Sequence, residues 1–416
     1  MGRYDLADQR SFATGEPVFC LAPEVGVVGL KGPDALALLS ALTTLPPQEE
    51  PPPPGTEALV FNAQGHIQFA FQLAEPVPGD SSDWLLLTDG LAQALAGFLN
   101  SRRFRLRAEA TARTDLAVAL TPGPLNQSVF GPDGVDWASS PDGWPGTPDW
   151  PNRAGLEARP ESLNQWDKPD EPYQVDQPSQ PNLPQRRWRQ AVKPRYCLVE
   201  PHPGAGWRGM TSHIYDPTAP NPLPERLERR GYRQIDGAAL EALRIAAWRP
   251  LASREAADGK TLPHELDWLR TTTPVNSGCY PGQETVAKII NVGKPPRRLV
   301  FLHLDGSDGV LPQVGAAVTV ARSELGGTDE AAGGTASAAC GLLTSVGVHH
   351  ELGPIALALV KRTTPRDVDL LVDALDAPGG LIAASQTEIV PVNGESDARP
   401  ARRATLPKLS RRARVQ

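Results

Sequence analysis

A thiol and a carboxylate stand close together around a tight turn at residues 278–284, whose sequence is Gly-Cys-Tyr-Pro-Gly-Gln-Glu. Gly278, Gly282 and the proline between them keep side-chain bulk low, so the backbone can approach a ligand closely. The next run, 285–290, predicts a short helix or strand. If it is a helix, unpaired amides at its N-terminus favour a thiolate at Cys279 or a bound anion. The same residues also fit a glycine-rich turn with a buried cysteine.

This turn resembles the signature of the YgfZ/GcvT-like folate-binding proteins, usually Lys-Gly-Cys-(Tyr/Phe)-x-Gly-Gln-Glu. Ser277 stands where that signature usually has lysine. Further segments resemble the actinobacterial branch of the same family, namely 243–250, 262–269, 291–299 and 349–357. Six defined positions of the signature match, and they are Gly278, Cys279, Tyr280, Gly282, Gln283 and Glu284.

The resemblance implies an α+β fold. It consists of a GcvT-like folate-binding domain with ferredoxin-like halves, followed by a small C-terminal antiparallel β-barrel. The implied cofactor is tetrahydrofolate or a one-carbon-substituted folate. The implied function is support of iron–sulfur enzyme assembly or repair, with an indirect effect on tRNA modification, and the implied partners are iron–sulfur client or assembly proteins. In this interpretation Cys279 is a functional thiol facing the folate or a partner's sulfur or iron.

A folate site needs hydrogen-bonding groups for the pterin edge, flat apolar walls, and basic residues for the glutamate tail. Gln283 and Glu284 could supply the first, while Tyr280 and Trp248 could form the walls. Gly282 would allow close approach. Basic residues in and after the signature are candidates for the tail, although those at 294–298 also fit a solvated turn; they are Lys288, Lys294, Arg297 and Arg298.

Two enzymatic alternatives remain open. The segment 62–69 resembles the glycine cleavage T-protein, an aminomethyltransferase, but Gln68-Phe69 stand where that family has an Asp-Asp pair. Because Gln68 cannot act as a general acid or base, we expect a folate binder without that catalysis. A cysteine hydrolase would use Cys279 as nucleophile and His264 or His350 as base. No metal site is expected, because neighbours such as His349 and His350 point to opposite faces of a strand.

Composition excludes several classes of protein. The net charge of −7 gives the body no nucleic-acid footprint, so no DNA binding is expected. No apolar run reaches the length of a membrane span, and the N-terminus lacks the apolar stretch of a signal peptide. The four cysteines form no CxxC pair, which argues against a zinc ribbon, an iron–sulfur ligand run or a disulfide scaffold. We therefore expect a cytoplasmic protein with reduced thiols.

Hydrophobic periodicity divides the chain into five parts. The resemblance implies that residues 1–121 are the N-terminal α+β half of the folate-binding domain, and composition predicts that 122–225 are a Pro/Trp-rich insertion or linker that is largely irregular. By the same resemblance residues 226–298 are the second part of that domain, and helical spacing predicts a helix at 238–247. Residues 299–393 form the barrel, and 394–416 a basic disordered tail with seven basic residues from Arg399 onward.

Individual elements follow from alternation and helical spacing. In the first part we expect two helices, at 35–42 and 91–99, and strands at 25–30, 59–61, 66–73, 84–88 and 104–108. In the barrel we expect six short strands, at 299–304, 317–320, 341–348, 355–360, 368–372 and 383–390.

Overall fold

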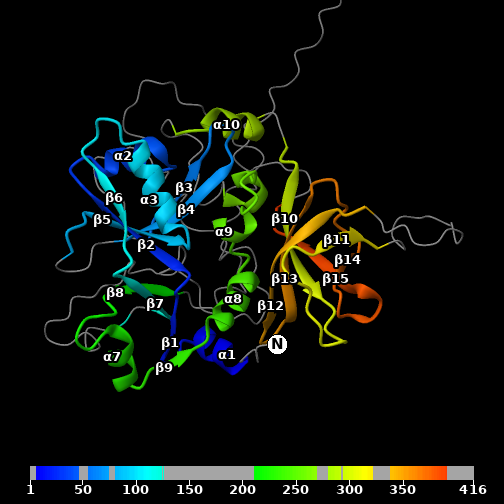
Figure 1. Ribbon diagram of the computed structural model, residues 1–416. Helices are drawn as coiled ribbons and strands as arrows, with labels where there is room; N and C mark the ends of the chain where they lie inside the picture. The colour runs from blue at the N-terminus through cyan, green and yellow to red at the C-terminus, as the bar shows by residue number, and fades with distance from the viewer. Residues whose placement is uncertain are drawn as a thin grey trace, which may run out of the picture.

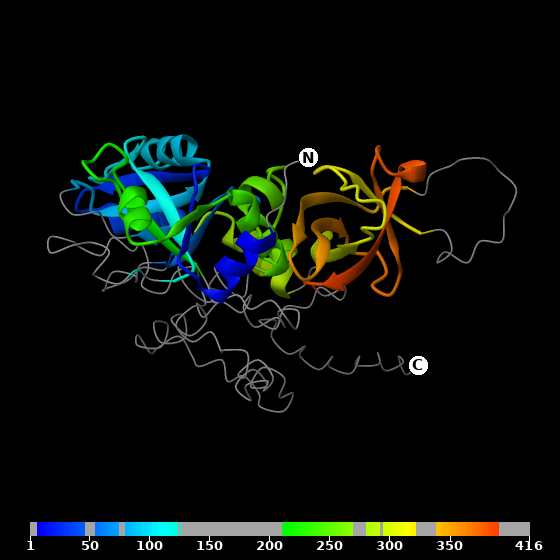
Figure 2. The same ribbon diagram turned by 90° about the horizontal axis from the view of Figure 1, so that it is seen from below.

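The computed structural model describes residues 6–45, 55–74, 80–123, 125, 210–268, 280–291, 294–321 and 338–390. Several predicted features lie outside the described residues: Ser277, Gly278, Cys279, the tail 394–416, and all of the predicted insertion up to residue 209 except Pro122, Gly123 and Leu125. The rest forms a two-sheet body and a barrel, with a group of helices between them (Figures 1 and 2).

The larger sheet of the body is antiparallel throughout, in the order β3-β4-β5-β2-β6. Two helices, α2 (Ala35–Leu42) and α3 (Ala92–Ser101), pack on one of its faces. The succession β2-α2-β4-β5-α3-β6 is the βαββαβ order of a ferredoxin-like unit, with β3 added at the edge. The strands are β2 (Val25–Lys31), β3 (Glu57–Phe61), β4 (Ile67–Ala74), β5 (Trp84–Asp89) and β6 (Glu109–Ala112).

The smaller sheet has the order β8-β7-β1-β9, with β1 and β9 parallel. It packs on the face of the larger sheet that α2 and α3 leave free, where Val27, Leu85 and Leu87 contact its residues. Its elements are α1 (Leu6–Thr14), β1 (Val18–Leu21), β7 (Ala117–Thr121), β8 (Thr211–Tyr215), α7 (Leu223–Arg229), β9 (Arg233–Ile235) and α8 (Gly237–Ala246).

Two expectations differ from the structure. The predicted strand at 104–108 is wrong, because Phe104 has a positive φ of 48° and Asp34 accepts a hydrogen bond from the Arg107 amide in a turn before β6. The predicted irregular segment 122–225 is regular where its end is described, since 211–215 form β8 and α7 begins at Leu223. The residues of β8 are largely polar and yet buried, so they show no hydrophobic alternation.

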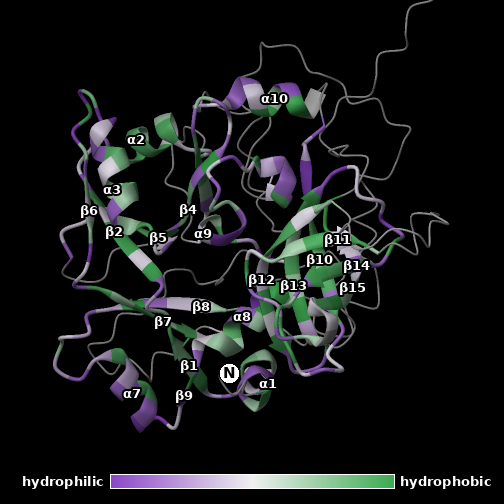
Figure 3. Cartoon of the chain, turned by 45° about the vertical axis from the view of Figure 1, so that its right-hand side comes forward, coloured by the Kyte–Doolittle hydropathy of each residue, from purple (hydrophilic) through white to green (hydrophobic). Residues whose placement is uncertain are grey.

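Six antiparallel strands close into the predicted C-terminal barrel, in the order β10-β13-β12-β11-β14-β15. Alternate residues of β10 face opposite sides: Val300 and Leu302 pack inside the barrel, while Leu299 and Phe301 pack outside it against the body. Much of the barrel's strand ribbon has the hydrophobic colour in Figure 3, and its inward-facing side chains form one buried hydrophobic cluster. They are β10 (Arg297–Leu304), β11 (Ala317–Val320), β12 (Gly341–His349), β13 (Gly353–Lys361), β14 (Leu370–Asp373) and β15 (Leu381–Glu388).

One hydrophobic cluster joins the body to the barrel, and we call it the interdomain cluster. It receives side chains from β3, β4 and β10, and from four helical segments that lie between the two parts (Figure 1). These segments are α8, α9 (Ala252–Glu255), η3 (Pro263–Leu266) and α10 (Gln283–Asn291). Its buried aromatic members are Phe61, Trp268, Tyr280 and Phe301.

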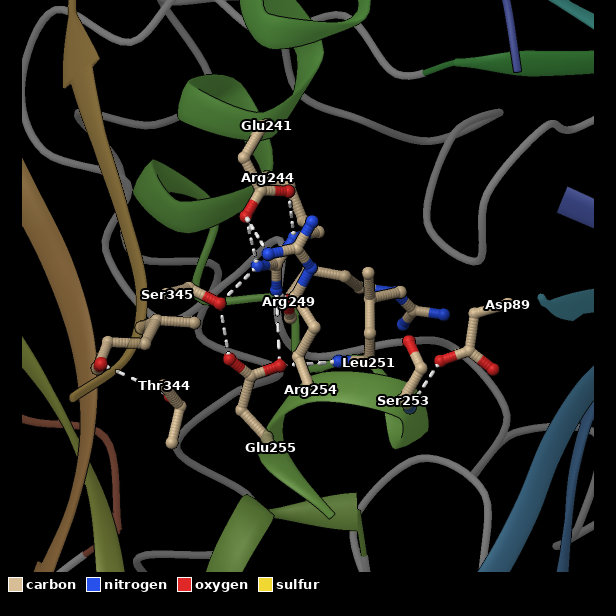
Figure 4. A network of polar contacts seen from close by, with 11 residues as sticks. Asp89, Glu241, Arg244, Arg249, Leu251, Ser253, Arg254, Glu255, Thr344 and Ser345 are labelled. Atoms are coloured by element: carbon tan, nitrogen blue, oxygen red, sulfur yellow. Dashed lines mark hydrogen bonds and ion pairs between the residues drawn. The ribbon is translucent and has the colours of Figure 1, made fainter. Parts of the chain in front are cut away.

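A buried polar network also crosses from the helices to the barrel (Figure 4). Arg244 of α8 donates to the Ser345 hydroxyl of β12 at 2.6 Å, and that hydroxyl donates to Glu255 of α9 at 2.6 Å. Arg244 also pairs with Glu255 at 3.3 Å and with Glu241 at 2.7 Å. All the groups that cross between the two parts are buried, so each charge depends on the others for compensation.

We expect that Glu255→Ala will lower the free energy of unfolding by about 3–5 kcal/mol, because it leaves the Arg244 guanidinium buried beside one carboxylate fewer. Urea unfolding of the full chain measures this. Glu225→Ala is the matched control, since it removes a carboxylate from a solvent-exposed pair with Arg229 and should cost less than about 1 kcal/mol. Equal effects of the two substitutions would show that the network contributes no more than a surface ion pair.

Candidate functional site

The described end of the signature turn lies directly against the β3–β4 hairpin turn. Gly282 has a φ of 81°, and a Cβ added there would be 2.5 Å from the Asn62 carbonyl oxygen and 2.8 Å from the Gly65 nitrogen. Gly65 has a φ of 77° and faces the Gly282 carbonyl in return. The Asn62 side chain fixes the hairpin turn by accepting from the Gln64 and His66 amides, each at 3.0 Å. Two segments singled out in the sequence therefore meet backbone to backbone.

The residues after this turn form a helix, which decides between the two expectations for 285–290. The first turn of α10 begins with the Val286 amide donating to the Gly282 carbonyl at 3.1 Å. Val286 is buried in the interdomain cluster, while Glu284 and Lys288 are exposed on the opposite face. Gln283 is half-buried. The environment of Cys279, just ahead of this helix, stays a prediction because that residue lies outside the part described.

His264 anchors η3 to α10. Its Nε2 lies 3.1 Å from the Val286 carbonyl, and since a carbonyl can only accept, Nε2 carries the proton. Burial lowers the pKa of His264 to about 4, so the ring is neutral at pH 7. His350, the other base considered for a hydrolase, follows β12 beside α1, where its amide donates to the Gln9 side chain. The elements that these two histidines contact, α10 and α1, lie at opposite ends of the interdomain region (Figure 1).

The two predicted aromatic walls both belong to the interdomain cluster or pack on it. Tyr280 is buried, its ring centroid 5.7 Å from that of Phe61, and burial raises the pKa of its hydroxyl above the usual range. Trp248 is half-buried, and its ring centroid lies 6.0 Å from that of Phe301. The fold therefore brings these two aromatic residues, far apart in the sequence, to one cluster.

The two neighbouring arginines of β10 face opposite sides of the barrel wall. Arg297 faces outward and pairs with Asp258 at 2.6 Å and with Glu265 at 3.0 Å. Arg298 faces inward and is fully buried, donating to the Thr364 carbonyl and the Gln386 side chain, each at 3.0 Å. Only Arg297 is on the side of the wall that the body covers, and it already has two carboxylate partners. The predicted role of both in holding a folate tail stays a prediction.

Asp89, which the sequence interpretation did not single out, borders the interdomain cluster. It is the last residue of β5, and its Oδ2 accepts from the Ser253 amide of α9 at 2.6 Å (Figure 4). Its Oδ1 is buried and has no hydrogen-bond partner among the residues that the structure describes. Burial, with a smaller effect of Glu255, raises the pKa of Asp89 above its usual value. In the sequence, Asp89 could have been noticed as an acidic residue that ends an apolar strand just before Gly90.

Three further findings concern Gln68, metal ligands and membrane-spanning helices. Gln68, singled out by the resemblance to the T-protein, is half-buried on β4 and donates to the Ile67 carbonyl at 3.1 Å. Within the described ranges, no group of three His, Cys, Asp or Glu side chains could hold a metal ion. Within the same ranges, none of the helices combines the length and the apolar character needed to cross a membrane.

No family model matches the sequence, and no curated protein matches it. Among solved structures, the fold is similar to the crystal structure of glycine cleavage system aminomethyltransferase T from Bartonella henselae. The two chains share 15% sequence identity with a TM-score of 0.55, over 94% of this chain and 90% of that chain. The predicted fold class, an α+β fold like that of the glycine cleavage aminomethyltransferase followed by a closed antiparallel barrel, is therefore confirmed.

The contact between the two turns predicts an unequal effect of two glycine substitutions. Gly231 has a φ of 83°, close to that of Gly282, but a Cβ added there would meet nothing within 4 Å. We expect Gly231→Ala to cost about 1 kcal/mol of folding free energy through its positive φ alone. Gly282→Ala should cost about 1–3 kcal/mol more, because the hairpin backbone must move. Urea unfolding of both variants tests this, and equal losses would contradict the close packing.

Proposed function

We propose that this protein binds tetrahydrofolate, or a one-carbon-substituted form, between its α+β body and its barrel. We further propose that it is of the YgfZ type and supports assembly or repair of iron–sulfur enzymes, with an indirect effect on tRNA modification. The carrying observation is the contact of the signature turn at Gly282 with the hairpin turn at Gly65. This contact lies beside the interdomain cluster, in a fold similar to that of an aminomethyltransferase.

The pterin ring needs flat walls and an acceptor for its amino and ring N–H groups. Tyr280 and Trp248 supply aromatic surface in one cluster. Asp89 is a better acceptor than Glu284, because its Oδ1 is already desolvated and has no partner in the described structure. Glu284 is exposed, so water competes for its hydrogen bonds. Gln283 remains available at the first turn of α10 as a neutral hydrogen-bonding group.

The glutamate tail of a folate requires positive charge. Arg297 carries one, but Asp258 and Glu265 already surround it, which leaves the local charge negative. Lys288 and Lys294 are exposed on and after α10. In this proposal the two lysines attract the tail, and Arg297 mainly joins η3 to the barrel.

Aminomethyl transfer is the second candidate, because the fold similarity is to an aminomethyltransferase. That reaction needs a carboxylate to polarise the folate amine, and the amide of Gln68 carries no charge and exchanges no proton at neutral pH. Production of methylenetetrahydrofolate from an aminomethyl donor would favour this candidate. Binding without turnover would favour a folate-dependent assembly factor.

We expect isothermal titration of the full chain with tetrahydrofolate, and with its methylene form, to give saturable heat, and thermal stability to rise with ligand. Asp89→Asn keeps the shape and an acceptor for Ser253 but removes the charge, so its Kd should rise about 10- to 100-fold. Asp115→Asn, which changes an exposed carboxylate paired with Arg113, is the control and should bind like the wild type. If millimolar ligand gives no heat and no increase in thermal stability, the folate proposal is wrong. An unchanged Kd in Asp89→Asn would remove Asp89 alone from the site.

The thiol provides a separate test. Burial raises the pKa of Cys20 to about 12 and also raises that of Cys340, so both should react slowly. Cys279 should label with iodoacetamide faster than either, as followed by peptide mass spectrometry, and bound folate should slow it. Cys279→Ala should change the folding free energy by less than about 1 kcal/mol and yet fail to restore iron–sulfur enzyme activity in cells lacking the protein. Slow labelling together with full complementation would reduce Cys279 to a packing residue.

A further inference from the structure

Among the described residues, the arginine inside the barrel finds partners for only part of its hydrogen-bonding capacity. Arg298 is 0% exposed, and its Nη2 alone has partners, the Thr364 carbonyl and the Gln386 side chain. Its Nε and Nη1 have no hydrogen-bond partner among the residues that the structure describes. A guanidinium is always charged and offers five N–H donors, so a buried one normally has its charge and its donors matched.

The negative charge near Arg298 does not compensate its buried positive charge. Desolvation lowers its pKa below the usual value for arginine, and the opposing effect of Glu388 is smaller. No salt bridge to Arg298 is present within the described residues. Replacing a buried charge by apolar side chains is often neutral or stabilising, so an unpaired one carries a cost without a gain in stability. Such a group suggests a ligand of opposite charge.

Neighbouring groups extend the donor set at this end of the barrel, which we call the barrel mouth and define by Arg298, Cys340, Lys361, Thr364 and Gln386. The Thr364 hydroxyl is buried and has no hydrogen-bond partner in the part described. It lies near the Cys340 thiol, where it partly offsets the rise in that thiol's pKa caused by burial. The charges of Lys361 and Arg298 act on the same thiol. The Lys361 ammonium donates to the Ala339 carbonyl at 2.8 Å. The barrel mouth therefore combines unused donors with an excess of positive charge.

The strand register shows that these residues lie on neighbouring strands of the barrel. Arg298 of β10 is opposite Val360 of β13, and Val360 is opposite Gly341 of β12. Cys340 precedes Gly341 and accepts from the Lys361 amide at 2.7 Å. The site is thus built on four adjacent strands, β15 with Gln386, β10, β13 and β12, and on the turn after β13, which carries Thr364.

We propose that the barrel mouth binds a small oxyanion, whose oxygens accept hydrogen bonds from Arg298 Nε and Nη1 and from the Thr364 hydroxyl. A carboxylate and a phosphate share this chemistry, since each offers several acceptor oxygens and negative charge. Water could satisfy the donors but would leave the buried charge uncompensated. The site lies inside the barrel, whereas the proposed folate site lies outside its wall, so the two proposals are independent.

The test is thermal unfolding of the full chain, first dialysed into chloride and then titrated with inorganic phosphate or with acetate at constant ionic strength. Because Arg298 is fully buried, samples should equilibrate overnight before the scan. We expect at least one of the two anions to raise the Tm saturably, by about 2–4 °C near saturation. Comparison of phosphate with acetate identifies which source of the oxyanion the site takes.

Two variants locate the effect. Arg298→Met should abolish the anion-dependent shift in Tm, and Thr364→Val should reduce it while keeping the backbone carbonyl that Arg298 uses. Arg366→Met is the matched control, because it removes one exposed arginine, paired with Asp367, from the same barrel. It should retain the full shift. If Arg298→Met fails to fold, Thr364→Val still tests the site.

Nitrogen NMR of the wild-type protein gives a second measurement, since the Arg298 Nε–H signal should move on titration with the anion that raises the Tm. Three results would overturn the proposal. One is a shift in Tm no larger than that given by added chloride. Another is an equal shift in the wild type, Thr364→Val and, where it folds, Arg298→Met. The third is an Arg298 signal that stays unchanged at saturating anion, which would assign the unused donors to water.

Discussion

The buried network of Arg244, Ser345 and Glu255 is the interaction on which the arrangement of the two parts depends. Ser345 belongs to the barrel, and the other two belong to helices of the body, so the network holds the barrel against α8 and α9. Charges buried this way tolerate little displacement, because each loses its compensation when the others move. The interdomain cluster, with Tyr280 and Trp248, exists only in this arrangement.

Two glycines determine how the signature turn packs on the hairpin, because neither has a side chain. Gly282 and Gly65 let two turns touch backbone to backbone, and this contact places the start of α10 beside the hairpin. His264 then holds the helix by a hydrogen bond to the Val286 carbonyl. The exposed face of α10, with Glu284, is thereby placed at one end of the interdomain cluster, where the proposed folate would lie.

Strand alternation separates two arginines that adjoin in the sequence. Arg297 meets two carboxylates on the outer wall of the barrel, while Arg298 lies inside, where two of its nitrogens have no partner in the described part of the chain. Arg297 therefore connects η3 to the barrel, whereas Arg298 is the group that we propose binds an anion. A chain of only moderate size can in this way keep two chemically distinct sites apart by the thickness of one strand.

The sequence by itself determined the elements whose periodicity is local, such as the hairpin with its turn at 62–65 and the six barrel strands. It could not reveal β8, because Thr211, Ser212 and His213 are buried through pairing and packing rather than through their own hydrophobicity. Local pattern also could not show which face of β10 lies inside the barrel, or that Asp89 Oδ1 would have no partner among the described residues. Those properties depend on contacts between residues far apart in the chain, and only the tertiary structure decided them.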